Sequence, residues 1–229
     1  DQTISVASGF ESLDNVRIFC WDGVDTMMPL RRAASKKTDN PQIFVVGDTA
    51  AVTTGLSHNE GWGTYFGGLL DGATVINESK RDTSFNAFLQ EQLYTDMQSK
   101  WKSGDYCILA LGVGDAQNDN ITVEAYQSGL NEVISKAKAA GVTVILLKET
   151  RTADVKDLAA YDLILETIDE TAKTNSLDVI DLESATRNIP EVLLQTRGNA
   201  LTKSGARFVA ETIAELLHTT GSELQYYVK

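Results

Sequence analysis

The chain has 229 residues, of which 42% are hydrophobic and 23% charged, as in a typical folded globular protein. Its formal net charge of −12 opposes binding to phosphate backbones and anionic lipid, so we expect no nucleic-acid partner. No apolar run is long enough to cross a membrane, and no cysteine or histidine spacing indicates a metal site. We therefore expect no membrane association, no metal and no other cofactor.

The first forty residues differ from the rest of the chain. Residues 3–7 and 16–21 look like β segments, and residues 31–40 look like a polar linker. Residues 19–30 resemble the closing strand of β-sandwich modules in secreted, multi-modular bacterial proteins. That resemblance alone leads us to expect a β extension over residues 1–40 and a secreted or cell-surface location. Cys20 lies in this extension, and it is either a free thiol or bonded to Cys107, the only other cysteine.

From residue 43 onward, short apolar runs alternate with helical patterns. The runs lack strict alternation of apolar and polar residues, which suits strands buried on both faces of a parallel sheet. Strand–helix alternation predicts right-handed βαβ units in a three-layer α/β/α sandwich, with ligands bound beyond the carboxyl ends of the strands. The expected strands are 43–47, 73–77, 106–112, 142–148 and 177–181, and the expected helices are 84–100, 123–140, 155–175 and 203–218.

Several blocks between residues 42 and 219 resemble the SGNH, or GDSL, hydrolases. A strand that ends in Gly47-Asp48 and a hydroxyl residue is similar to the first block of that family. Gly61-Trp62-Gly63 and Ser204-Gly205-Ala206-Arg207 are similar to the branch of carbohydrate esterases that contains the rhamnogalacturonan acetylesterases. The resemblance implies a flavodoxin-like domain over residues 41–219, with five parallel strands in the order 2-1-3-4-5, followed by a C-terminal tail at 220–229.

The catalytic positions implied by this resemblance are substituted. Ester hydrolysis of this kind needs a nucleophile, a base and donors to the oxyanion. The family's nucleophile, oxyanion-asparagine, acid and base positions hold Thr49, Gly114, Arg197 and Ala200, and its oxyanion glycine falls on Arg81 or Asp82. The sequence therefore predicts a catalytically degenerate esterase-like domain with a binding or structural role.

Two other readings stay open. One is an active carbohydrate esterase in which Thr49 attacks and either His58 or Asp115 acts as the base. The other is a different chemistry in the same crevice. His218, the second of the two histidines, lies at the end of the last predicted helix, where an exposed residue facing the helix dipole is expected.

Charged side chains are expected to gather at the predicted crevice. They could bind a polysaccharide or another protein module, with arginine forks for carboxylates, or they could pair with each other and fill the old site. We expect Arg81, or failing that Arg197, to lie in the former oxyanion region and pair with Asp48 or Asp115. The candidate binding residues are Asp48, Arg81, Asp82, Asp115 and Arg151.

Overall fold

The computed structural model describes residues 40–56, 59–117, 122–151, 158–189 and 200–229. All of them belong to one of the two compact units of the chain, residues 39–229. The β segments expected at 3–7 and 16–21 lie outside the described residues, as does Cys20. Cys107 is a buried free thiol, and its burial raises the pKa to about 12.

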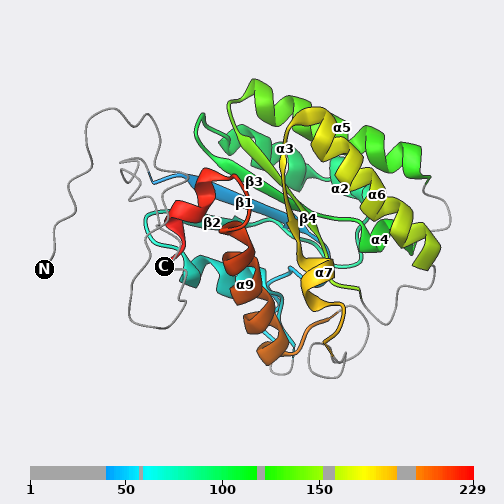
Figure 1. The fold of residues 1–229 in the computed structure, drawn as a ribbon. Helices are drawn as coiled ribbons and strands as arrows, with labels where there is room; N and C mark the ends of the chain where they lie inside the picture. Colours follow the sequence, from blue (N-terminus) through cyan, green and yellow to red (C-terminus); the bar gives the residue numbers. More distant parts are fainter. Residues whose placement is uncertain (1–39, 57–58, 118–121, 152–157, 190–199) are drawn as a thin grey trace, which may run out of the picture. The chain divides into compact units, whose positions relative to one another are not determined.

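A single sheet of five parallel strands runs through the domain in the order β2-β1-β3-β4-β5 (Figure 1). The predicted strand order is therefore confirmed. The carboxyl ends of the strands meet at one edge of the sheet, where ligands bind in open α/β folds. The strands are β1 (Gln42–Gly47), β2 (Thr74–Asn77), β3 (Tyr106–Ala110), β4 (Thr143–Lys148) and β5 (Asp178–Asp181).

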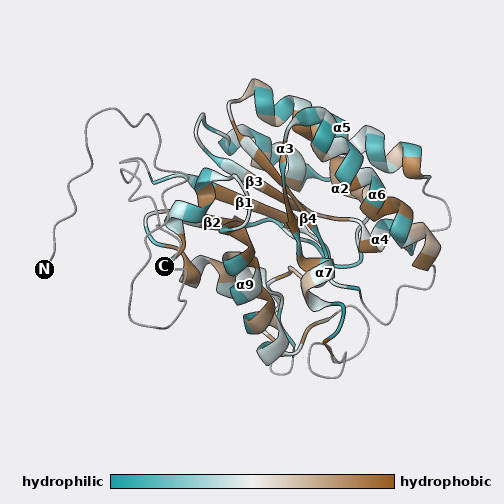
Figure 2. Ribbon diagram, viewed as in Figure 1, coloured by the Kyte–Doolittle hydropathy of each residue, from teal (hydrophilic) through white to brown (hydrophobic). Residues whose placement is uncertain are grey.

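Both faces of the sheet are covered, which explains why the strand sequences lack polar alternation (Figure 2). In β1, Phe44 and Val46 pack in one core cluster, and Ile43 and Val45 pack in the other. The helices around the first cluster are α2 (Phe85–Leu89), α3 (Gln92–Lys100), α4 (Val113–Ala116), α5 (Val123–Ala139) and α6 (Leu158–Asn175). Those around the second are α1 (Gly63–Phe66), η1 (Gly67–Leu69), α7 (Leu182–Thr186), α9 (Lys203–Leu217) and η2 (Glu223–Tyr227).

Local signals account for most helix ends. Thr202 caps α9 by accepting a hydrogen bond from the backbone N–H of Gly205, as its hydroxyl predicted. Gly141 follows α5 with a φ of 74°, a conformation that favours glycine. The single helix expected at 84–100 is instead two helices, because the backbone of Glu91 is extended (φ −80°, ψ 144°).

The segment that we set apart as a C-terminal tail packs on the domain. Leu224 and Tyr227, three residues apart on η2, are buried in the second core cluster. The backbone N–H of Lys229 donates to the carbonyl of Leu69 at 3.0 Å, and Val228 pairs with Leu70. Residues 220–229 therefore complete the core beside η1, because their apolar side chains find a partner there.

Candidate functional site

The turn after β1 places Thr49 at the carboxyl edge of the sheet. The backbone N–H of Ala51 donates to the carbonyl of Asp48 at 3.0 Å and closes the turn. A β-carbon on Gly47 would lie 2.6 Å from the Ala51 side chain, so the turn requires glycine there. Thr49 is 5% exposed, so its hydroxyl lies inside the site.

Asp82 is both the hydrogen-bond acceptor and the hydrogen-bond donor of the Thr49 hydroxyl. Thr49 Oγ1 donates to Asp82 Oδ1 at 3.1 Å and accepts from the Asp82 backbone N–H at 3.0 Å. Asp82 has a φ of 47°, in the left-handed region where glycine is usual. Of the two residues, Asp82 is the one whose backbone N–H donates to the Thr49 hydroxyl.

The loop that carries Asp82 lies directly against Gly114 on α4. A β-carbon on Gly114 would meet the carbonyl oxygen of Thr83 at 2.1 Å. The space in which the family's asparagine side chain would begin is therefore occupied by backbone. Glycine at position 114 therefore allows this loop to approach.

Asp48 and Asp115 accept hydrogen bonds from backbone amides. Asp48 accepts from the N–H groups of Ala50 at 3.4 Å and Gly114 at 3.2 Å. Both carboxylate oxygens of Asp115 accept from the Phe85 N–H, at 3.0 and 2.9 Å, and so anchor the start of α2. Burial raises the pKa of Asp48 to about 6 and that of Asp115 to about 7.

This arrangement corrects the expected arginine pairing. Arg81 is exposed and makes no hydrogen bond or ion pair with any residue that the structure describes. Asp48 and Asp115 instead accept hydrogen bonds from the backbone N–H groups of Gly114 and Phe85. Arg197 lies outside the described residues.

The sequence reasoning missed a third buried carboxyl, that of Glu149. Glu149 follows β4 directly and is 3% exposed. Its Oε1 accepts from the indole N–H of Trp62 at 3.0 Å. Burial, and then the negative charge of Asp48, raise the pKa of Glu149 to about 8. The available signal was the polar run Lys148-Glu149-Thr150 at the end of a buried strand.

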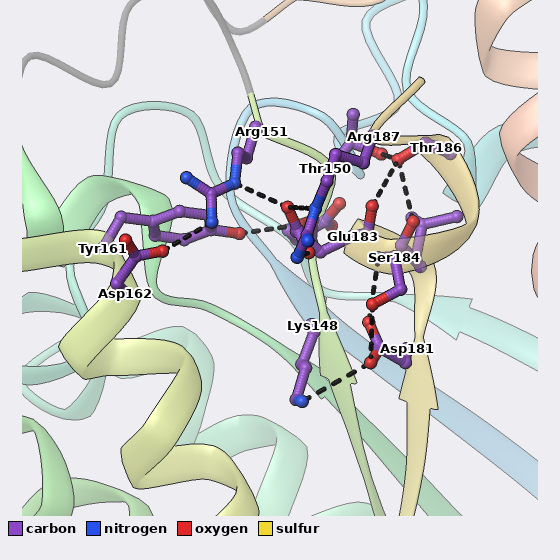
Figure 3. Close-up of polar contacts among 12 residues, drawn as sticks. Lys148, Thr150, Arg151, Tyr161, Asp162, Asp181, Glu183, Ser184, Thr186 and Arg187 are labelled. Carbon is purple, nitrogen blue, oxygen red and sulfur yellow. Dashed lines mark hydrogen bonds and ion pairs between the residues drawn. The ribbon is translucent and has the colours of Figure 1, made fainter. Parts of the chain in front are cut away.

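Arg151 belongs to an ion-pair network at the rim of the site (Figure 3). Its Nε donates to Glu183 Oε1, and its terminal nitrogen donates to Asp162 on α6. Arg187 also donates to both carboxylate oxygens of Glu183, which is 1% exposed. The charge of Arg151 is therefore shared with two carboxylates, and this network ties the loop after β4 to α7.

The family's base position offers no proton acceptor. Ala200 is buried, and the next residue, Leu201, accepts a backbone hydrogen bond from Glu60 at 3.2 Å. His218 is the C-cap of α9, at the other end of that helix from Ala200. His58 lies outside the described residues. Asp115 accepts from the backbone N–H of Phe85, whereas Asp82 is the carboxylate that accepts from the Thr49 hydroxyl.

Within residues 40–229, apart from the gaps given above, no group of three or more histidine, cysteine, aspartate or glutamate side chains is placed to hold a metal ion. No helix in the same parts is long and apolar enough to span a membrane.

The chain has the fold of the SGNH, or GDSL, hydrolases, as comparison with solved structures shows. An acetylxylan esterase from Geobacillus stearothermophilus superposes with a TM-score of 0.62 at 14% identity, over 82% of this chain and 98% of that chain. A protein assigned to the lipolytic G-D-S-L family from Desulfitobacterium hafniense gives 0.63 at 18% identity, over 77% and 99%.

A protein from Bacillus subtilis gives a TM-score of 0.68 at 20% identity over 80% of this chain. This chain spans 57% of the length of that protein. No protein-family model matches the chain, and no curated protein matches its sequence. The likeness is thus one of fold, at identities where the residues of the site must be argued individually.

Proposed function

We propose that this chain is a catalytically silent SGNH-type domain whose former ester-hydrolysis site is closed by its own loop. The observation that carries the proposal is the double hydrogen bond between Thr49 and Asp82. The hydroxyl that would attack a substrate is occupied as donor and as acceptor by one neighbouring residue. The N–H that would stabilise an oxyanion is used in the same pair.

The missing groups support the same proposal. Removal of a single oxyanion donor reduces kcat by roughly 10²–10³ in a comparable hydrolase. Here the asparagine position holds Gly114, and the Thr83 carbonyl stands where a side chain would begin. The methyl group of Ala200 cannot accept the proton that a histidine would take. Nucleophile activation and oxyanion stabilisation are both impaired.

One observation favours a second candidate, an active carbohydrate esterase with Thr49 as the nucleophile. The 3.1 Å contact between Thr49 Oγ1 and Asp82 Oδ1 is a nucleophile–carboxylate hydrogen bond of the length that proton transfer requires. In that reading Asp82 is the base, in place of His58 or Asp115. The extra methyl of threonine crowds the attack, and this is a reason to rank it second.

Hydrolase assays separate the two candidates. The wild type and Thr49→Ala are compared on p-nitrophenyl acetate and on acetylated pectic sugars. Each protein is also treated with a serine-directed phosphonate, and its intact mass is measured by mass spectrometry. We expect no turnover above buffer and no label. Labelling at Thr49, or turnover that is lost in both Thr49→Ala and Asp82→Asn, would establish the active esterase instead.

The proposed role is binding or structural, with a polysaccharide or another protein module as the partner. The motivation is the resemblance of residues 19–30 to modules of secreted, multi-modular proteins and the esterase-type fold of the domain. Affinity electrophoresis in gels that contain acetylated or deacetylated pectin or xylan tests the polysaccharide. If one glycan retards the wild type and does not retard Asp82→Ala, the crevice is supported as the binding site. Equal mobility in all gels directs the search to protein partners.

A further inference from the structure

Trp62 connects the turn after β1 to the end of β4. Its side chain is fully buried, and its indole N–H donates to Glu149 Oε1 at 3.0 Å. Its backbone N–H donates to the carbonyl of Ala50 at 2.9 Å, next to Thr49. Movement of Glu149 would therefore be transmitted to the wall of the candidate site through one side chain.

The second carboxyl oxygen of Glu149 makes no hydrogen bond to the described residues. Glu149 Oε2 is buried and has no hydrogen-bond partner among the residues that the structure describes. An ionised carboxylate with a bare buried oxygen loses its hydration without replacement, which is a large cost. A neutral carboxyl group keeps the Trp62 contact and avoids most of that cost.

The surroundings of Glu149 add negative charge, and no described cation forms an ion pair with its carboxylate. Asp48 lies close enough for its charge to act on Glu149. The hydroxyl of Tyr161, on α6, donates to the Glu149 backbone carbonyl at 2.6 Å. The neighbouring cations are committed elsewhere, Lys148 to Asp169 and Asp181, and Arg151 to Glu183 and Asp162. The titratable groups around Glu149 and Tyr161 are Asp48 after β1, Asp115 after β3, Tyr126 on α5, Tyr161 on α6 and Glu183 on α7.

We propose that Glu149 and Asp48 form a pH-sensitive latch, in which neutral Glu149 holds the Gly61-Trp62-Gly63 turn against β4 and loss of its proton loosens that turn. Two neighbouring buried carboxyls without a counterion cannot both ionise at low cost. The second ionisation therefore favours conformations in which Glu149 reaches water, and Trp62 loses its acceptor in them. The proposal does not depend on whether the domain is an enzyme.

The sign of the effect follows from linkage. The pKa of Glu149 is raised from 4.5 to about 8 in the folded protein, so the folded state binds this proton more tightly than the unfolded chain. The stabilisation of the seated turn by this proton is therefore fully present below about pH 4.5 and falls as the pH rises from there through about 8. It is lost progressively as the pH rises, by at most about tenfold in the equilibrium constant per pH unit for one group.

Glu149→Gln imitates the neutral form and tests the latch. Hydrogen exchange of peptides that cover residues 60–66 is compared between variant and wild type at the same pH, so that the chemical exchange rate cancels. We expect equal exchange at about pH 4, where Glu149 is neutral in either conformation, and at least about tenfold faster exchange in the wild type at about pH 9. Glu215→Gln, on the exposed face of α9, is the matched control and should behave as the wild type does. Equal exchange in Glu149→Gln and wild type at both pH values would overturn the proposal.

A second measurement needs no variant. In wild-type protein labelled with ¹³C at glutamate carboxyls, we expect one glutamate resonance to titrate with a midpoint near the pKa of about 8. Titration of every glutamate below about pH 6 would overturn the latch even if Glu149→Gln does not fold.

Discussion

The carbonyl oxygen of Thr83 lies 2.1 Å from the position that a β-carbon on Gly114 would take. This contact relates the glycine at position 114 to the path of the loop that carries Asp82. While the loop runs here, residue 114 can carry no side chain. An asparagine at position 114 would therefore require the loop from Arg81 to Ser84 to move, together with the bond from Phe85 N–H to Asp115.

Gly114→Ala should destabilise the fold by about 1–3 kcal/mol, because its methyl group meets backbone that cannot yield without moving the loop. Urea unfolding measures the effect. Gly68→Ala is the matched control, since a β-carbon there has nothing within 4 Å. Equal unfolding midpoints for the two variants would show that the loop adapts freely.

Asp82→Gly and Asp82→Ala both remove the carboxylate that accepts from the Thr49 hydroxyl and keep the backbone N–H that donates to it, but they differ in backbone preference. At a φ of 47°, alanine pays a left-handed penalty of about 1 kcal/mol that glycine does not. We expect Asp82→Gly to be the more stable variant by about that amount in urea unfolding. If Asp82→Ala is at least as stable, the left-handed conformation does not constrain this position.

Asp115→Asn should flatten the pH dependence of stability between pH 4 and 7. The folded-state pKa of Asp115 is raised by burial from 3.8 to about 7, so wild-type stability falls as pH rises through that window. Asparagine keeps an oxygen for the Phe85 N–H and carries no charge. Thermal unfolding at pH 4, 5.5 and 7 measures the slope. Parallel profiles for variant and wild type would contradict the assignment.

Glu183→Gln should have the opposite pH signature. Burial raises the pKa of Glu183, but hydrogen bonds from Arg187 and Arg151 outweigh burial, and the net pKa is lowered. Its contribution is therefore present above about pH 4.5 and is lost as the pH falls through the folded-state pKa. We expect a loss of about 1–3 kcal/mol at pH 7 that shrinks at low pH. Glu166→Gln, exposed on α6, should show neither effect in the same urea titrations.

The strand order was predictable because it rests on apolar runs and on family blocks that are contiguous in the chain. The limits of the elements were less predictable. β3 ends at Ala110 and not at 112, because Gly112 turns the chain with a φ of 148°. The division of the expected 84–100 helix at Glu91 has no clear signal in the sequence, since neither glycine nor proline stands there.

The sequence supplied only some of the residues at the candidate site. Thr49 is hydrogen-bonded to Asp82, and Gly114 donates to Asp48, the neighbour of Thr49 in the chain. The partners of Asp48 and Asp115 are backbone amides, whose directions depend on turn conformation and leave no mark on residue type. The bond between Trp62 and Glu149 joins residues 87 positions apart, beyond the range of any local pattern.

The burial of η2 sets a practical limit on how this protein can be dissected. A chain cut at residue 219 would lack Leu224 and Tyr227 and leave the surface beside Leu70 uncovered. Exposed apolar surface of this kind promotes aggregation. Recombinant versions of the domain should therefore extend to Lys229. A purification tag is best attached through a spacer, because the Lys229 ammonium group itself donates to the Gly68 carbonyl.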